Sequence, residues 1–141
     1  MREVEEAELR ARCRGRLREG RARRWQGGRN EAPVSTRHTL DDELASAVVA
    51  WLDSDDGGVL DFASEVTNGE RTLGARAAGI IASRRGDAGL GDRALVASFR
   101  GAAGQSFGAF ALPGMRLVLE GEAQDYVGKS LAGGELVLRP R

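Results

Sequence analysis

Apolar residues recur at helical spacing in the first structured stretch of the chain. Its apolar face consists of Leu40, Leu44, Val48, Trp51 and Leu52. This spacing predicts a helix from about residue 40 to 52. Thr39 stands just before it with Asp42 three positions on, which is the spacing of a capping box.

The next apolar runs predict a strand and a second helix. Residues 59–66 follow a Gly-Gly pair and read as a strand, the first side of the β structure that follows. A helix is predicted from about residue 74 to 85, with Gly86 as its stop. Its apolar face consists of Leu73, Ala77, Ile80 and Ile81. We expect both helices to pack on the β structure or to cover its end.

From about residue 94 to 141 the pattern becomes a repeat. Residues 101–114 recur as residues 121–134, with glycines twenty positions apart. A third pass begins at once, since residues 136–139 echo residues 117–120 at a spacing of nineteen. A fixed period of this size is typical of a solenoid, in which each repeat forms one coil.

The period also suits the size of a β-helix coil. Roughly twenty residues at about 3.3 Å each give a perimeter near 65 Å, enough for three short sides. Glycine recurs where a corner requires a positive φ or a close approach of backbones. The glycines predicted at corners are Gly101, Gly104, Gly108, Gly114, Gly121, Gly128 and Gly134.

Stacked coils predict columns of residues one period apart. An inward apolar column would consist of Phe99, Leu119 and Leu138. The next position along each strand points the opposite way. An outward ladder of alternating charge would therefore consist of Arg100, Glu120 and Arg139.

Two strings within the repeat carry a family resemblance. GQSFGAF at residues 104–110 and DYVGK at residues 125–129, with weaker support upstream, resemble the glycine-patterned (GXGXG) β-helix domain that closes the large subunit of glutamate synthase. The resemblance covers roughly residues 35–141 and implies a domain over residues 34–141. It implies a mostly β fold: a short right-handed single-stranded β-helix, or solenoid, with two accessory α-helices.

The resemblance also implies a function. In glutamate synthase the glutaminase, flavin and iron–sulfur parts lie in other domains, and the β-helix is regarded as a scaffold. We therefore expect a noncatalytic structural or assembly module of a glutamate synthase-like oxidoreductase complex, serving glutamate biosynthesis. It would bind no cofactor itself, with FMN and iron–sulfur clusters only in partner chains. One alternative is a subunit that contributes to amidotransferase or oxidoreductase activity only in complex.

The family domain normally continues for several more coils, whereas this sequence stops at Arg141. A partner that caps the last coil, or a truncated relative, would account for the difference. The expected partners are glutaminase-like and flavin-containing subunits, or further copies of this chain bound through the last coil.

Residues 1–33 form an arginine-rich tail. Residues 1–30 hold ten arginines against five glutamates, although the whole chain has zero net charge. Few large apolar residues occur there, so a disordered or frayed segment is expected. An independent binding module that uses this tail is the second functional alternative. Nucleic acid is not the expected partner, because glutamates interrupt the arginines and only Trp25 could stack on a base.

Composition narrows the remaining classes. The single cysteine, Cys13, cannot form an internal disulfide or hold an iron–sulfur cluster alone. No run of about 18 apolar residues occurs, and the arginine-rich start is unlike a signal peptide. We therefore expect a cytoplasmic protein with no membrane partner.

Two motif matches resemble catalytic sites. Ser106 lies in a G-x-S-x-G string, but that motif needs a following helix, and the only histidine, His38, precedes the serine. Lys129 lies in a relaxed P-loop string, but Asp125 would repel a phosphate. We interpret Ser106 as a polar corner residue and both strings as products of the repeat. No catalytic, cofactor-binding or metal site is predicted.

Overall fold

The computed structural model describes residues 39–54 and 57–141. The described residues all belong to one compact unit, Arg37–Arg141. The predicted tail, with Cys13 and Trp25, lies outside the described residues, and so does His38.

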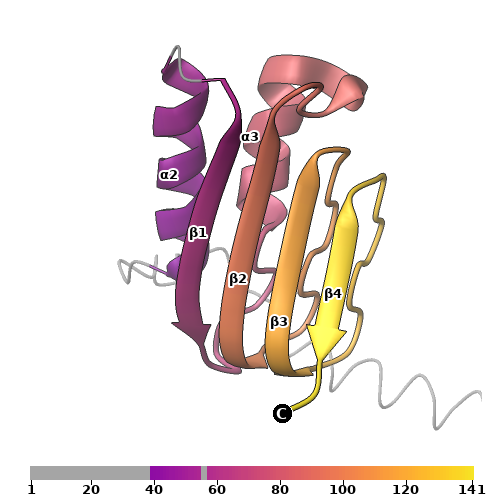
Figure 1. The fold of residues 1–141 in the computed structure, drawn as a ribbon. Coiled ribbons are helices and arrows are strands. Elements are labelled where there is room, and N and C mark those ends of the chain that lie inside the picture. The colour runs from indigo at the N-terminus through magenta and orange to yellow at the C-terminus, as the bar shows by residue number, and fades with distance from the viewer. Residues whose placement is uncertain (1–38, 55–56) are drawn as a thin grey trace, which may run out of the picture. The chain divides into compact units, whose positions relative to one another are not determined.

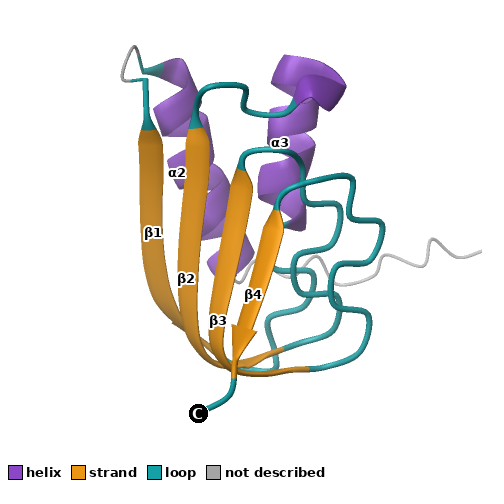
Figure 2. Cartoon of the chain, turned by 45° about the vertical axis from the view of Figure 1, so that its right-hand side comes forward, coloured by secondary structure: helices purple, strands orange, loops and turns teal. Residues whose placement is uncertain are grey.

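A four-stranded parallel sheet and two α-helices make up most of the described chain (Figure 1). The strands follow one another in the sheet in the order β1-β2-β3-β4. The helices and the long connecting loops lie on the same side of the sheet (Figure 2). The elements are α2 (Leu40–Asp53), β1 (Val59–Val66), α3 (Ala75–Arg85), the 3₁₀ turn η1 (Gly86–Ala88), β2 (Ala94–Ala103), β3 (Met115–Ala123) and β4 (Glu135–Arg139).

The start of α2 is the capping box that the sequence predicts. The Asp42 N–H donates to Thr39 Oγ1 at 3.2 Å, and the Thr39 N–H donates to Asp42 Oδ2 at 3.0 Å. Each side chain thus satisfies a backbone donor that the helix itself leaves unpaired. The predicted apolar face is confirmed as well, because Leu44 and Val48 are fully buried.

The second predicted helix is also present, as α3. Gly86 ends it with φ +65°, and the Gly86 N–H donates to the Ala82 carbonyl. Gly74 precedes its first residue and supplies no side-chain cap. Ala77 and Ile81 turn into the core and are fully buried. None of the helices in the described part of the chain is long and apolar enough to cross a membrane.

The repeat appears as stacked strands and stacked return loops. Phe99 pairs in register with Leu119, and Leu119 with Leu138, so the predicted apolar column is confirmed. The loops that leave β2 and β3 also lie one above the other. The Ser106 N–H donates to the Asp125 carbonyl at 2.9 Å, and the Gly128 N–H donates to the Phe107 carbonyl at 2.9 Å.

The return loops repeat their backbone conformation as well as their contacts. Ser106 and Tyr126, twenty residues apart, both have φ +64°. Phe110 and Ser130, also twenty apart, have φ +61° and +55°. Left-handed backbone is uncommon for residues other than glycine, so its recurrence at one period shows that the loops are structural repeats.

The segment before α3 follows the start of the same path. The Thr72 N–H donates to the Gln105 carbonyl at 2.8 Å, and the Gly108 N–H donates to the Leu73 carbonyl at 2.9 Å. The chain then leaves this path into α3 before it returns to β2. The first connection therefore begins like the return loops and continues as a helix.

The core lies between the sheet and the elements behind it. Leu95, Phe99, Leu117 and Leu119 point inward from β2 and β3 and are almost completely buried. Phe107 of the first return loop packs edge-on against Phe99, with ring centroids 5.8 Å apart. Ala97, between Leu95 and Phe99, is also fully buried. The alternate positions Val96, Ser98 and Val118 point outward, as the alternation of a strand requires.

Two glycines permit the closest approach of backbones in the sheet. Gly101 pairs with Val66 on one side and with Gly121 on the other. A Cβ atom on Gly121 would overlap the carbonyl oxygen of Gly101. Both glycines also have positive φ, +134° and +145°. Side chains at these positions would push the strands apart.

This close approach predicts a large effect for one added methyl group. Gly121→Ala is expected to lower the free energy of unfolding by about 3 kcal/mol or more, because overlap and backbone strain act together. The matched control is Gly79→Ala, at a position in α3 where a Cβ meets open space. That change is expected to raise the free energy of unfolding by about 0.5–1 kcal/mol. Urea unfolding measures both, and similar effects for the two variants would contradict the steric account.

Candidate functional site

Charged side chains gather in one row across the outer face of the sheet. The row consists of Glu65, Arg100, Glu120 and Arg139, which are neighbours in register. Arg100 Nη2 lies 3.2 Å from Glu120 Oε2. Among the ion pairs of the described residues, none joins Glu120 to Arg139. The structure thus places the three residues of the predicted ladder side by side, with an ion pair between the first two.

The charged row borders a hollow of about 540 Å³ on the same face. Small and apolar residues of the neighbouring row, among them Ala63, Ser98 and Val118, line the rest of it. Beyond that row, Arg116 Nη1 and Glu135 Oε2 form a second cross-strand ion pair at 2.6 Å. Acids and bases alternate along the charged row, so it is suited to recognition by complementary charge.

The predicted corner glycines occupy three kinds of position. Gly101 and Gly121 lie within β2 and β3. Gly104, Gly108 and Gly128 lie in the return loops, and a Cβ on Gly108 would meet the side chain of Leu136. The remaining two, Gly114 and Gly134, precede β3 and β4 with φ +89° and +80°.

Neither catalytic-looking string adopts the structure that its chemistry needs. Residues 104–110 form turns, and the chain then continues into β3 with no helix after Ser106. Residues 128–134 likewise hold no helix, so no helix N-terminus follows Lys129. The Lys129 ammonium instead lies 5.5 Å from the centre of the Tyr126 ring. Across the described residues, no group of three or more His, Cys, Asp or Glu side chains could hold a metal ion.

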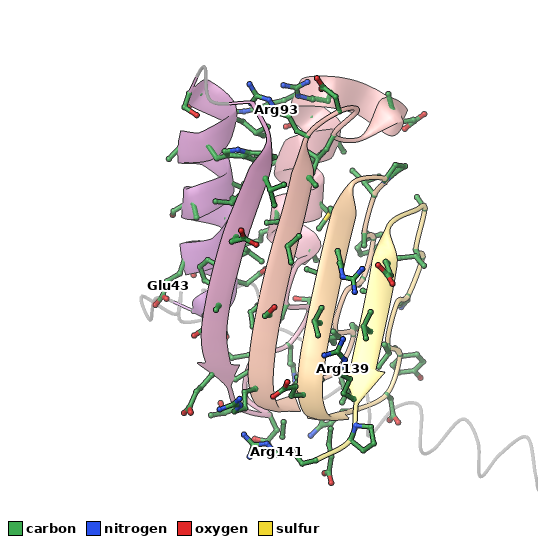
Figure 3. All side chains as sticks on the ribbon, in the orientation of Figure 1. Glu43, Arg93, Arg139 and Arg141 are labelled. Atoms are coloured by element: carbon green, nitrogen blue, oxygen red, sulfur yellow. The ribbon has the colours of Figure 1, made fainter. Side chains whose placement is uncertain are left out.

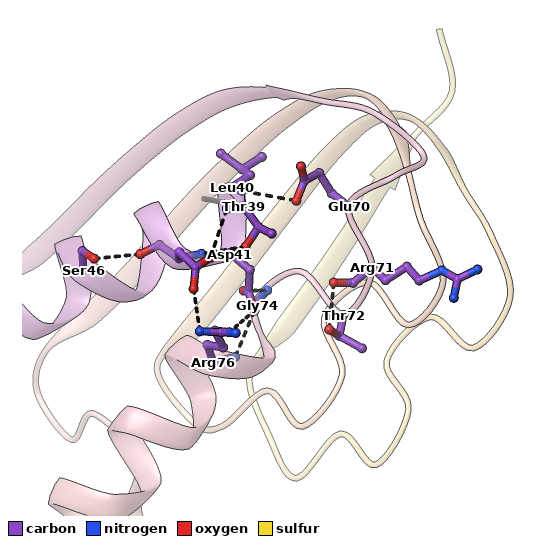
Figure 4. Close-up of polar contacts among 10 residues, drawn as sticks. Thr39, Leu40, Asp41, Ser46, Glu70, Arg71, Thr72, Gly74 and Arg76 are labelled. Carbon is purple, nitrogen blue, oxygen red and sulfur yellow. Dashed lines mark hydrogen bonds and ion pairs between the residues drawn. The ribbon is translucent and has the colours of Figure 1, made fainter. Parts of the chain in front are cut away.

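Asp41 is the buried charged residue of the described chain (Figure 4). Its Oδ1 accepts a hydrogen bond from the Gly74 N–H at 2.7 Å, and its Oδ2 accepts one from the Arg76 N–H at 3.4 Å. Arg76 Nε lies 3.9 Å from the same carboxylate. Asp41 of α2 therefore caps the first turn of α3, which has no capping side chain of its own.

Burial raises the pKa of the Asp41 carboxyl above its ordinary value of 3.8. The hydrogen bonds from Gly74 and Arg76 and the Arg76 charge act in the opposite direction, because they stabilise the carboxylate, while the charge of Asp42 adds to the rise. Burial is the largest of these influences.

The end of α2 is likewise held by a residue from another element. Arg93, labelled in Figure 3, stands just before β2. Its guanidinium donates to the Trp51 and Ser54 carbonyls at 3.4 Å and lies 5.5 Å from the centre of the Trp51 ring. A positive charge at this position also suits the negative end of the helix dipole.

Sequence reasoning missed the role of Asp41. Its spacing from Leu44 and Val48 places it on the apolar stripe of α2, where an acid requires a hydrogen-bonding partner. Gly74, at the start of α3, offers no cap. These two signals together could have indicated the contact.

The family model described as the GXGXG motif matches residues 41–141. The chain belongs to the GXGXG motif family. The match begins at Asp41, the second residue of α2, and includes α3 and the four strands of the described sheet.

The GXGXG chain aligns with several glutamate synthases. It is 40% identical to ferredoxin-dependent glutamate synthase 1 of Arabidopsis thaliana over 101 residues, 72% of this chain and 6% of that one. It is 37% identical to the glutamate synthase [NADPH] large chain of Azospirillum brasilense over 113 residues, 80% of this chain and 7% of that one. Over 75 residues, 53% of this chain and 5% of the relative, it is 52% identical to ferredoxin-dependent glutamate synthase 2 of Synechocystis. The aligned segment is thus a small part of each of these proteins.

The buried cap predicts a distinctive dependence of stability on pH. Because the folded-state pKa of Asp41 is raised, the native state holds this proton more tightly than the unfolded state just above pH 3.8. The Asp41 contribution to the free energy of unfolding should therefore fall as pH rises through that window. Asp41→Asn keeps an acceptor for the Gly74 N–H, but its side chain does not titrate. Its free energy of unfolding should therefore lack this dependence on pH.

The comparison needs two further variants. Asp41→Ala leaves the buried Gly74 N–H without its acceptor and should cost about 1–3 kcal/mol, in addition to losing the same dependence on pH. Asp61→Asn, on the exposed face of β1, is the control for removing an acid elsewhere. Urea unfolding across the acid range measures all four proteins. If the free energies of unfolding of wild type and Asp41→Asn differed by the same amount at every pH, the effect given to burial of Asp41 would be contradicted.

Proposed function

We propose that this chain is a noncatalytic structural module of a glutamate synthase-like oxidoreductase complex in the cytoplasm, serving glutamate biosynthesis. The observation that carries the proposal is the family match over residues 41–141, together with relatives that are glutamate synthases. The arrangement of polar groups also supports it. Asp41 and Arg93 hold helix ends, and the charged row lies on an outer face suited to contact with another protein.

We further propose that the stacked strands and loops form a short right-handed β-helix. The hydrogen bonds between loops, such as Phe110 N–H to the Lys129 carbonyl at 2.9 Å, support continuous coils. Parallel strands joined by crossovers almost always follow the right-handed path. Such a solenoid is rigid along its length, which suits a spacer that sets the orientation of attached parts.

The cofactors of the complex belong to partner chains under this proposal. FMN and iron–sulfur clusters would be held by those chains, and the glutaminase reaction would also take place there. In support, the residues that the structure describes contain no cysteine, and an iron–sulfur cluster needs several.

Affinity purification of the 141-residue chain from its native cell extract tests the proposal. The expected result is recovery of glutaminase-like and flavin-containing chains, identified by mass spectrometry and by the flavin absorbance of the eluate. Recovery of the chain without them would contradict the proposed complex. An Arg100→Glu variant shows whether the charged row takes part, because it places three acids side by side. Gly79→Ala is the control that leaves this face unchanged.

Reconstituted glutamate synthesis then separates a structural role from a catalytic one. Ser106→Ala and Lys129→Ala remove the two side chains that resemble catalytic groups. For a structural module, the rate of glutamate synthesis per flavin in the assembled complex should be the same in both variants as in wild type. A lower rate in a complex of normal composition would instead support a subunit that contributes to amidotransfer or oxidoreduction.

The binding-module alternative predicts a different result in the same purification. Replacing the arginines within residues 1–33 by glutamine would then abolish capture of partners, and capture by wild type would weaken steeply with salt. Under our proposal, the partners are retained after this change.

A further inference from the structure

Within the described residues, β4 has a neighbour on one side only, because β3 pairs with it and no strand follows it in the sheet (Figure 1). The other edge of β4 presents unpaired backbone groups, which readily accept a further strand. Apolar side chains of this last coil are also partly exposed. Leu138 is 42% exposed, although its register partner Leu119 is fully buried.

Two copies of β4 are complementary in charge when they run antiparallel. The strand reads Glu135-Leu136-Val137-Leu138-Arg139, with opposite charges at its ends and Val137 at its centre. In an antiparallel pair of two such strands centred on Val137, each Glu135 lies opposite Arg139 of the other copy. Each Leu136 then lies opposite Leu138, and the two Val137 residues face each other.

This pairing also places the outer faces of the two sheets on the same side. Glu135, Val137 and Arg139 point outward in both copies, while Leu136 and Leu138 point inward in both, because side chains alternate along a strand. The twofold axis stands perpendicular to the sheet, so the two sheets join into one. Such a contact closes on itself and does not grow into a fibre.

Head-to-tail stacking is less favourable in charge. If β1 of a second copy followed β4 in the parallel register of the sheet, Glu135 would face Asp61, and Arg139 would face Glu65. One repulsive pair would then offset one attractive pair. The antiparallel pairing has two attractive pairs and no repulsive pair along the strand.

We propose that two copies of this chain associate through antiparallel pairing of their β4 strands about Val137. The inference is independent of the proposed function, because it uses only the edge strand and its charges. If the chain did not dimerise, the capture of partner chains would be unaffected. If no partner chains were captured, the dimer could still form.

Two single-charge variants test the pairing by sedimentation equilibrium. Arg139→Glu places acids opposite acids twice in the pair, and Glu135→Arg places bases opposite bases twice. Each variant alone should dimerise at least about tenfold more weakly than wild type. Arg71→Glu changes an exposed charge in the loop before α3 and should dimerise as wild type does.

An equimolar mixture of the two weakened variants provides the decisive comparison. In the mixed pair, Glu135 meets Arg139 of the other chain, and the introduced Glu at 139 meets the introduced Arg at 135. Dimerisation should therefore return to near the wild-type strength. Loss of folding cannot mimic this result, because unfolded variants would not recover on mixing. A mixture that stays monomeric would overturn the proposal, as would a wild-type chain that is monomeric at high micromolar concentration.

Cross-linking checks the register in the full-length chain with Cys13→Ser. Val137→Cys should form a disulfide between copies under mild oxidation, because the two residues meet on the twofold axis. Val118→Cys, its register partner on β3, is the matched control. Its two copies would lie three strand spacings apart, roughly 14 Å, and should not cross-link. Equal cross-linking of the two variants would contradict pairing through β4.

Discussion

The close approach of neighbouring strands at two glycines is the constraint on which the rest of the structure depends. The sheet register joins Val66, Gly101 and Gly121 in one column. A Cβ atom on Gly101 would overlap the Val66 carbonyl, and one on Gly121 would overlap the Gly101 carbonyl. Once these residues are in register, the inward positions of successive strands coincide and form the apolar column at Phe99 and Leu119. The return loops then meet at matching points and form their own hydrogen bonds.

Much of this arrangement could be predicted from the sequence because it is periodic. The spacing of twenty between Gly101 and Gly121 predicts both the pairing of β2 with β3 and the facing of Arg100 with Glu120. The shorter spacing of nineteen likewise predicts the pairing of Leu117 with Leu136, which the structure confirms. Helix boundaries followed from capping residues close in sequence, such as Thr39 and Asp42. In each case, the signal is local or repeats at a fixed interval.

The contacts that were not predicted join elements that have no common period. Asp41 reaches the first turn of α3 from α2, and Arg93 reaches the last carbonyls of α2 from the start of β2. Such pairings depend on how helices dock, and neither spacing nor composition encodes that. The left-handed conformations of Tyr126 and Phe110 were missed for a related reason. Stacking imposes them on residue types that would otherwise avoid this region.

The two faces of the sheet have different consequences for function. The inward positions are filled by apolar packing, and the buried acid of the described residues, Asp41, caps α3. The interior therefore has little freedom to acquire new chemistry. The outward positions carry alternating charges whose order can change without disturbing the core. Charge order on an exposed sheet contributes more to the choice of partner than to affinity. Variation among GXGXG domains on this face should therefore alter which surfaces meet while the stacked strands and loops are retained.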